Sequence, residues 1–537
     1  MATASPPAPS PTSEELVVRR ALFEGALPGE ADDLSPAAAD RIAKAALSAL
    51  AVRQPGEAII DIGSLETEAG RRVTAITVVN DDMPFLVDSL TNALTVRGMG
   101  IQRLLHPIVA VTRNKKGEAT AINAADENGL GRAQRRDSDV PCESLIYIEA
   151  DRIGARGRAD LEGDLRGVLD DVRAAVIDWR SMLAKLETAS QSLLDASIPV
   201  PAGDVMEAKA FLDWLASDNF TLLGFAAYRF EGALQDEGMQ PEMEEGLGLL
   251  ADPEFPVWRG AEGFETLPSA LRAFMATPVP LLITKANAIS RVHRSTYYDV
   301  ISVKRYDGKG GVCGEYRFVG LFTSVALSTS PDEVPMMRRK IEAVRTALGF
   351  DPKSHSGKAL THIIETFPRT DLFLTSAERL ADMARGMLSL LDRPRPRLFV
   401  RADPFGRFVS AIVYVPRGIY NTGMRARSGA MLEDAFQARL ARFDVELRSE
   451  GLARVQYYLG TTPGQVPDTD ENDLNKRLET LVRGWDEALE AALISRLGGK
   501  PGGRLSLTYA GSFSPSYRDQ FDAEEAAIDV ERLSALK

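Results

Sequence analysis

The chain has little cysteine, little histidine and no long apolar run. Its 537 residues include two cysteines and four histidines. Cys142 and Cys313 are too few for a disulfide framework or a cysteine metal site, and a chain without disulfides is typical of the reducing cytoplasm. The histidines lack a third ligand at a recognised metal spacing, so we expect no metal site. No apolar stretch approaches the length of a membrane span, so no membrane partner is expected either.

The chain also has fewer basic than acidic residues. The formal net charge is −13, from 63 lysines and arginines against 76 aspartates and glutamates. Binding to nucleic acid generally needs a positive field, so nucleic acid is not an expected partner. The N-terminus is rich in Ala, Ser, Thr and Pro, with neither the basic start nor the apolar run of a targeting signal. Its composition predicts a disordered tail over residues 1–15.

The most informative stretch that is present runs from Arg397 to Asn421. Residues 398–401 alternate as a half-buried strand does, and Asp403-Pro404-Phe405-Gly406 then supplies the chemistry of a tight turn. The next run places small and β-branched residues on one face of a second strand: Val409, Ala411, Val413 and Val415. We therefore predict a hairpin with one face covered by helices.

Strand and helix patterns divide the chain into several units, as its length predicts. Residues 16–195 hold N-terminal helices and then the order strand–helix–strand–strand–helix. That order matches most of an ACT-like, ferredoxin-like βαββαβ module, although its closing strand is not visible. Within it, we expect a strand over 72–79, Asp81 or Asp82 as the cap of the next helix, Pro84 in that helix's first turn, and a buried stripe of Leu86, Leu90 and Leu94. We also expect a single strand over 101–111 and a single long helix over 160–194.

The remaining units continue an α+β multidomain pattern. Residues 196–330 predict a sheet-rich middle domain, compatible with a PAS-like fold, and with an acidic surface loop over 236–245. Residues 331–392 predict connecting helices, the first starting at a capping box in Ser330–Glu333. Residues 393–497 repeat the ACT-like order. Residues 498–537 predict a glycine-rich linker at 498–504, a strand at 505–509, and a further module cut off at the terminus.

The hairpin and three other segments together resemble the N-terminal half of the large bacterial NAD-dependent glutamate dehydrogenases. The other segments are Val79–Ser89, Asp218–Phe225 and His355–Arg369, and all four recur in family order. Members of that family are much longer, with catalytic and cofactor-binding domains after this part. The resemblance implies a regulatory and oligomerisation segment of an enzyme that oxidises L-glutamate to 2-oxoglutarate and ammonia. It implies NAD as the cofactor of the parent enzyme, and the downstream catalytic domain and identical subunits as partners.

We expect this segment itself to bind no NAD. The glycine-rich stretch Tyr306–Gly314 lies between two predicted strands, which is the context of a hairpin turn rather than of a phosphate-binding loop. The glycines at 498–503 follow a predicted helix, and no dinucleotide-binding glycine pattern follows a strand.

An amino-acid effector is the ligand that the resemblance to ACT modules implies. The candidate site follows the first strand of the first module and comprises Asn80, Asp81, Asp82, Met83 and Pro84. A helix N-terminus could hold an α-carboxylate, and an acidic side chain could meet the α-amino group. The other interpretation is a helix cap with a surface charge.

Arginines crowd the hairpin region of an otherwise acidic chain. Candidates for an interface with an acidic surface, in another subunit or in the catalytic domain, are Arg397, Arg401, Arg407 and Arg417. An anionic effector is a second interpretation, because arginine binds carboxylates and phosphates through two parallel hydrogen bonds. A solvated face is the third.

Two other functions stay open from the sequence. The chain could be a stand-alone amino-acid sensor of the ACT type without enzymatic activity. It could also be an enzyme in its own right that uses Asp81 and Asp82, although no base, nucleophile or metal set accompanies them.

Overall fold

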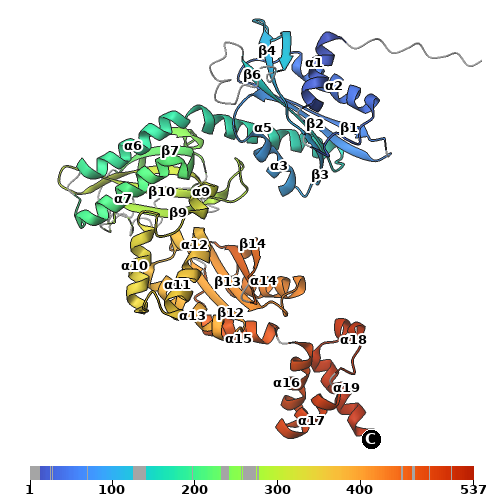
Figure 1. Ribbon diagram of the computed structural model, residues 1–537, viewed down its shortest axis with the longest axis vertical. Coiled ribbons are helices and arrows are strands. Elements are labelled where there is room, and N and C mark those ends of the chain that lie inside the picture. The colour runs from blue at the N-terminus through green and yellow to red at the C-terminus, as the bar shows by residue number, and fades with distance from the viewer. Residues whose placement is uncertain are drawn as a thin grey trace, which may run out of the picture.

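The computed structural model of the protein describes residues 12–536, apart from gaps at 25, 27, 69, 125–140, 196–197, 231–240, 256, 258–273, 275–276, 278, 449–450, 463–465, 483 and 510. Three sheets follow one another along the long axis, and a group of helices forms the C-terminal end (Figure 1). All strand pairs between the described strands are antiparallel. The predicted α+β class is confirmed, while the PAS-like assignment of the middle domain stays a prediction. The disordered tail was predicted for residues 1–15. Residues 1–11 lie outside the described part, and the prediction was wrong for residues 13–15, which belong to α1 (Ser13–Glu24).

The first sheet has helices on both faces. Its strands lie in the order β1-β2-β6-β4-β5, with β3 also paired to β6. One face packs on α1 and α2, and the other on α3 and α5. The elements, in chain order, are α1 (Ser13–Glu24), α2 (Pro36–Leu50), β1 (Ile59–Glu66), β2 (Arg72–Asp81), α3 (Leu86–Val96), β3 (Ile101–Leu105), β4 (Ile108–Arg113), β5 (Ala119–Ala124), β6 (Cys142–Ala150) and α5 (Ala155–Ile177).

The predicted strand over 72–79 is confirmed as part of β2, while the predicted bounds of two later elements are wrong. The stripe Leu86, Leu90 and Leu94 is buried as predicted. A single strand over 101–111 was wrong: the chain breaks into β3 and β4 at Pro107, which has no N–H to donate to a ladder. A single helix over 160–194 was also wrong. It divides at Asp178, whose carboxylate accepts the N–H of Gly248 from the middle sheet at 2.8 Å.

The middle sheet shares its two faces with both neighbours. Its order is β8-β7-β11-β10-β9. One face packs with α5 on the core of the first sheet, and the other packs on α6, α7 and the following helices. The elements are α6 (Trp179–Asp195), α7 (Ala202–Trp214), a π-helical turn (Leu215–Asn219), β7 (Phe220–Phe230), β8 (Pro241–Gly248), a short 3-10 turn (Leu249–Ala251), β9 (Leu281–Ile289), β10 (Tyr297–Tyr306) and β11 (Val312–Phe322).

The acidic loop predicted at 236–245 was wrong over its described part. Residues 241–248 form the edge strand β8, paired with β7. Glu244 on this strand pairs with Arg229 and, at 2.5 Å, with Arg305. Acidic side chains are therefore compatible with a strand here, because an edge strand can carry charge outward.

Connecting helices lead into a third sheet of order β12-β13-β15-β14. The helices are α9 (Ser324–Ser328), α10 (Met337–Leu348), α11 (His355–Thr366), α12 (Arg369–Leu374) and α13 (Ala377–Asp392). The sheet and its covering helices are β12 (Arg397–Ala402), β13 (Phe408–Pro416), α14 (Thr422–Phe436), β14 (Arg439–Leu447), β15 (Leu452–Gly460) and α15 (Glu471–Val482).

The predicted hairpin is confirmed. The N–H of Gly406 donates to the Asp403 carbonyl at 2.9 Å, and Gly406 has φ +65°, which favours glycine. The predicted face of Val409, Ala411, Val413 and Val415 is fully buried against α14 and α15. The opposite face carries Phe399 and Tyr414, which pack toward α13.

The capping box at Ser330–Glu333 was wrong. Helix α10 begins later, at Met337, because Pro335 disfavours a helical conformation in the residue before it. The first turn of α10 is capped from a distant helix: Glu207 of α7 accepts the Met336 N–H at 2.8 Å.

The C-terminal helices form a small separate core (Figure 1). They are α16 (Trp485–Leu497), α17 (Gly499–Tyr509), α18 (Pro515–Gln520) and α19 (Ala523–Ala535). The predicted linker at 498–504 and strand at 505–509 were wrong, since residues 499–509 form α17 and Gly498 alone separates it from α16. A Cβ at Gly502 would lie 2.5 Å from the Leu493 carbonyl oxygen, so this glycine permits close packing of α17 on α16. Within the described ranges, no helix is both long and apolar enough to cross a membrane.

The contact between the middle sheet and α12 can be tested at an aromatic stack. The rings of Phe322 and Phe373 are parallel, with centroids 4.2 Å apart, and both residues are buried. We expect Phe322→Ala to lower the free energy of unfolding by about 3–5 kcal/mol, because it removes a buried ring and leaves a cavity. Denaturant unfolding followed by tryptophan fluorescence measures this. Phe350→Ala, at a 37% exposed position, is the control and should cost far less.

Candidate functional site

The predicted effector segment lies at the end of β2, before α3. Asp81 is the last residue of β2, and α3 begins only at Leu86. The residue before α3, Phe85, has a left-handed conformation with φ 71°, and no described side chain caps the helix. The predictions that Asp81 or Asp82 caps α3 and that Pro84 lies in its first turn were therefore wrong. Long-range ion pairs hold Asp81 at the strand end instead.

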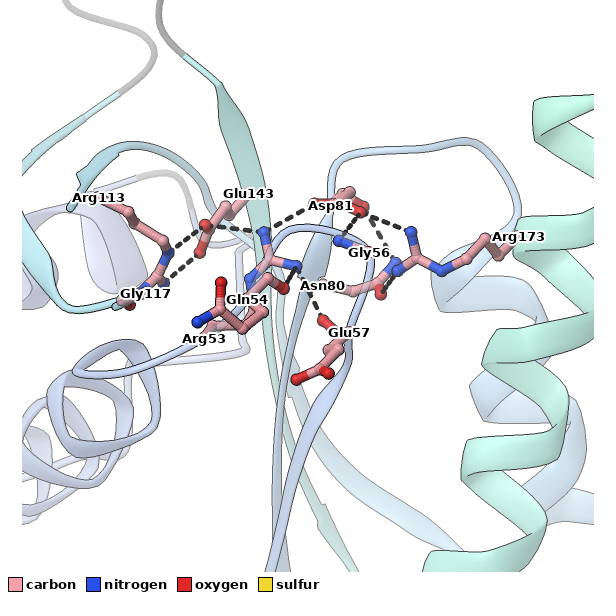
Figure 2. A network of polar contacts seen from close by, with 10 residues as sticks. All are labelled: Arg53, Gln54, Gly56, Glu57, Asn80, Asp81, Arg113, Gly117, Glu143 and Arg173. Carbon is pink, nitrogen blue, oxygen red and sulfur yellow. Dashed lines mark hydrogen bonds and ion pairs between the residues drawn. The ribbon is translucent and has the colours of Figure 1, made fainter. Parts of the chain in front are cut away.

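An arginine after α2 is the centre of these ion pairs (Figure 2). One nitrogen of Arg53, Nη2, donates to Asp81 at 2.7 Å and to Glu143 at 2.8 Å, and Nη1 donates to the Glu57 carbonyl at 2.8 Å. Arg113 of β4 binds both oxygens of Glu143 at 2.7 Å. Both Arg53 and Glu143 are almost fully buried. We call this set, with Arg173, the Arg53 network.

Arg173 of α5 completes the network from the other side of Asp81. It donates to the Asp81 carboxylate and to the Asn80 side-chain oxygen, both at 2.6 Å. The network therefore joins the segment after α2 to β2, β4, β6 and α5 (Figure 2). The ion-pair partners of the network are 28 to 92 residues apart in the chain, so no local pattern could have indicated them.

The network keeps its carboxylates ionised. Burial alone would raise the pKa of Asp81, but the hydrogen bonds and charges of Arg173 and Arg53 outweigh it and lower that pKa. Burial alone would also raise the pKa of Glu143, but the hydrogen bonds and charges of Arg113 and Arg53 outweigh it and lower that pKa. A carboxylate that stays ionised and fully paired is a poor general acid or base at neutral pH. The geometry thus argues against the reading of Asp81 as a catalytic residue.

The neighbouring candidates Asp82 and Met83 are also engaged in contacts within the chain. Asp82 accepts a hydrogen bond from Ser144 at 2.9 Å, and Met83 is buried. The Asp81 carboxylate that we expected to meet an effector amino group is shared between two arginines. An effector role of Asn80, Asp81, Asp82, Met83 and Pro84 stays a prediction, and its ligand would have to displace one of these ion pairs.

Two of the four interface arginines lie at contacts inside the chain. Arg401 of β12 pairs with Asp371 of α12 through Nε at 2.7 Å, and both are buried. Arg407 binds Asp403 at 2.8 Å and donates to Thr284 of the middle sheet at 2.7 Å. Arg401 and Arg407 therefore hold the third sheet against α12 and β9.

The other two interface candidates are more accessible. Arg417 is exposed, and Arg397 is half-buried with its guanidinium 5.8 Å from the centre of the Phe399 ring. A role of these arginines in contacts with another subunit or domain stays a prediction.

A cavity of about 400 Å³ lies where the middle sheet, α12 and the third sheet meet. Its wall combines aromatic and apolar side chains with several charged groups, a composition typical of small-molecule sites. The lining residues extend from Lys285 to Tyr458 in the chain, so the sequence alone could not have grouped them. We call this the joint cavity. Elsewhere in the described part, no group of three or more His, Cys, Asp or Glu side chains is arranged to hold a metal ion.

The chain is a multidomain α+β protein, in which the first and third sheets, each with its own helices, are joined through the middle sheet and the connecting helices. Family models for the domains of glutamate dehydrogenase match the chain in this order: ACT1 domain at residues 20–165, helical motif 1 at 334–393, ACT2 domain at 397–486 and helical motif 2 at 492–536. The two ACT matches fall on the first and third sheets, and the helical motifs fall on the two helical segments.

Similar proteins carry the same family name. The chain is 35% identical over 475 residues to the NAD-specific glutamate dehydrogenase of Halomonas elongata and 33% identical over 464 residues to that of Pseudomonas aeruginosa, in each case over 86% of this chain. The corresponding protein of Mycobacterium tuberculosis is 28% identical over 503 residues. This chain belongs to the large NAD-dependent glutamate dehydrogenase family and corresponds to the N-terminal region of its members. It spans 28% of the length of the first two relatives.

Removing the centre of the Arg53 network should destabilise the first sheet. In Arg53→Met, two carboxylates lose a shared partner, and Glu143 is buried, so we expect a loss of about 3–5 kcal/mol in unfolding free energy. Urea unfolding measures the loss. Arg20→Met breaks an exposed pair with Glu24 and should cost less than about 1 kcal/mol. Equal effects of the two substitutions would contradict a structural role for the network.

The same network should give the protein acid sensitivity. The pKa values of Asp81 and Glu143 are lowered below their ordinary values of 3.8 and 4.5, so their pairing contributes stability above those values and loses it as pH falls through the lowered ones. The difference in unfolding free energy between wild type and Asp81→Asn should be largest near neutral pH and shrink in acid. A difference that stays constant from pH 7 into the acid transition would be the contrary result.

Proposed function

We propose that this chain is the N-terminal regulatory and oligomerisation segment of an NAD-dependent glutamate dehydrogenase. The parent reaction converts L-glutamate, NAD and water to 2-oxoglutarate, ammonia and NADH. The observation that carries the proposal is the order of four glutamate dehydrogenase domain matches over residues 20–536. On this proposal the catalytic domain and its NAD belong to another part of the same polypeptide, in the cytoplasm.

Assembly with identical subunits is supported by the free edge of the third sheet. Strand β14 lies at that edge and is exposed along almost its whole length. Phe443, Val445 and Leu447 on this strand are 41%, 39% and 51% exposed. An edge strand with accessible backbone groups and alternating apolar side chains can pair with a strand of another chain.

Regulation is supported by the way the modules meet. Apolar cores continue from the first sheet through α5 into the middle sheet, and from the middle sheet through the connecting helices into the third sheet. A ligand or a neighbouring subunit that shifts one sheet would therefore press on the next, because packed interiors are not compressible. An amino-acid effector is one such ligand.

The proposal can be tested by assigning the dehydrogenase activity to a polypeptide. We expect the purified 537-residue chain to form no NADH from L-glutamate and NAD, measured by absorbance at 340 nm. The native protein captured from a cell extract with an antibody to this chain should form NADH and should be much heavier than 58.3 kDa. The known enzyme of a relative serves as the positive control.

Two results would overturn this proposal in different directions. NADH formation by the purified chain would make it an enzyme in its own right. A captured protein of about 58 kDa without activity would favour the stand-alone amino-acid sensor.

A further inference from the structure

One of the cationic side chains that line the joint cavity is not balanced by a carboxylate of the described residues. Four cationic side chains and two carboxylates line it: Lys285, Arg294, Arg401, Arg442, Asp299 and Asp444. Lys285 pairs with Asp299 at 2.6 Å and Arg442 with Asp444 at 2.8 Å. Arg401 pairs with Asp371 from behind the wall. Arg294 alone among these cations has no carboxylate partner in the described part of the chain.

Arg294 is held at the wall of the cavity with its hydrogen bonds incomplete. It follows β9 and donates from Nη2 to the Phe322 carbonyl at the end of β11. Its Nε is buried and has no acceptor among the described residues. Burial is the main cause that lowers the Arg294 pKa; Asp299 acts against it, and the nearby positive charge of Arg442 adds to it. A partly buried guanidinium without a counter-ion is costly, so an anion in the cavity would be favourable.

Hydroxyl donors and aromatic rings lie around the same space. Tyr297 and Tyr458 line the cavity, and neither hydroxyl has a partner within the residues that the structure describes. Phe408 also lines it and stacks on Tyr297, with ring centres 6.5 Å apart. A ligand that fits would carry a carboxylate for Arg294 and the hydroxyls, and an apolar body for the rings.

We propose that the joint cavity binds a small organic carboxylate of net charge −1 with an apolar body, held by Arg294. A single unmatched cation calls for one negative charge, and a volume of about 400 Å³ suits a small metabolite. The ligand would touch β9 and β10 of the middle sheet, α12, and β14 and β15 of the third sheet at once. Binding would therefore fix the two sheets relative to each other. The site is independent of the proposed dehydrogenase role, because it can be measured on this chain alone.

Three probes separate charge from shape in isothermal titration calorimetry with the 537-residue chain. 4-Methyl-2-oxopentanoate is a monoanion with an apolar body, L-leucine has the same body with no net charge, and inorganic phosphate is an anion without a body. We expect saturable binding of 4-methyl-2-oxopentanoate, much weaker binding of L-leucine, and no binding of phosphate at the same site.

The residues of the cavity supply matched variants. Arg294→Gln should weaken 4-methyl-2-oxopentanoate binding at least about ten-fold, as expected for loss of one charge-assisted pair. Arg385→Gln removes an arginine from an exposed pair on α13 and should leave binding unchanged. Ala441→Phe, at an exposed position of β14 that lines the cavity, should block binding without removing a charge.

Several results would overturn the site. They are the absence of saturable binding of 4-methyl-2-oxopentanoate, equal binding of L-leucine, or binding of phosphate alone. Unchanged affinity in both Arg294→Gln and Ala441→Phe would place any binding elsewhere. If Arg294→Gln does not fold, as judged by circular dichroism, Ala441→Phe decides the question, because it keeps every charge of the cavity.

Discussion

The buried carboxylate of Asp371 fixes how the third sheet meets the rest of the chain. Asp371 is 1% exposed and accepts hydrogen bonds from Arg401, from Ser410 at 2.8 Å, and from Gln456. These three donors come from β12, β13 and β15. A buried charge is tolerable only when its partners are complete, so α12 can dock on this sheet in very few ways. The other side of the same short helix places Phe373 against Phe322 of the middle sheet.

This arrangement makes α12 the common wall of two sheets and of the joint cavity. Thr370 and Leu374 of α12 line the cavity, one residue before and three after Asp371. The shape of the cavity therefore depends on a helix whose orientation is set by one carboxylate. At the first sheet, the Arg53 network acts in a similar way, because it ties the end of β2 to α5, and α5 packs on the middle sheet. Buried ion pairs thus fix how neighbouring modules meet, and apolar cores run continuously from one module into the next.

The sequence predicted what depends on near neighbours. The hairpin turn was correct because Asp403, Pro404 and Gly406 carry their conformational preference within four residues. The cap at Asp81 was wrong because its carboxylate is drawn to Arg53 and Arg173, far away in the chain. Distant partners also explain why the start of α10 was misplaced, since Glu207 caps it from another helix.

The glycines near the C-terminus also show that a local sequence pattern does not reveal how helices pack on each other. A run of glycines is typical of a linker, yet Gly502 serves close packing of two helices. The joint cavity was invisible for a related reason: its charges come from strands and loops of two sheets, and only the fold brings Arg294 and Arg442 near each other. Recognition of the family, by contrast, needed only short segments in the right order.

A double-mutant cycle between Asp371→Asn and Arg401→Met tests most directly whether the buried ion pair between α12 and β12 holds α12 on the third sheet. The unfolding free energies of the wild type, both single variants and the double variant give the coupling energy. Our account predicts a coupling of about 1–3 kcal/mol, with the double variant less destabilised than the two single effects added. Effects that add to within about 0.5 kcal/mol would show that the two residues act independently, and would contradict the account.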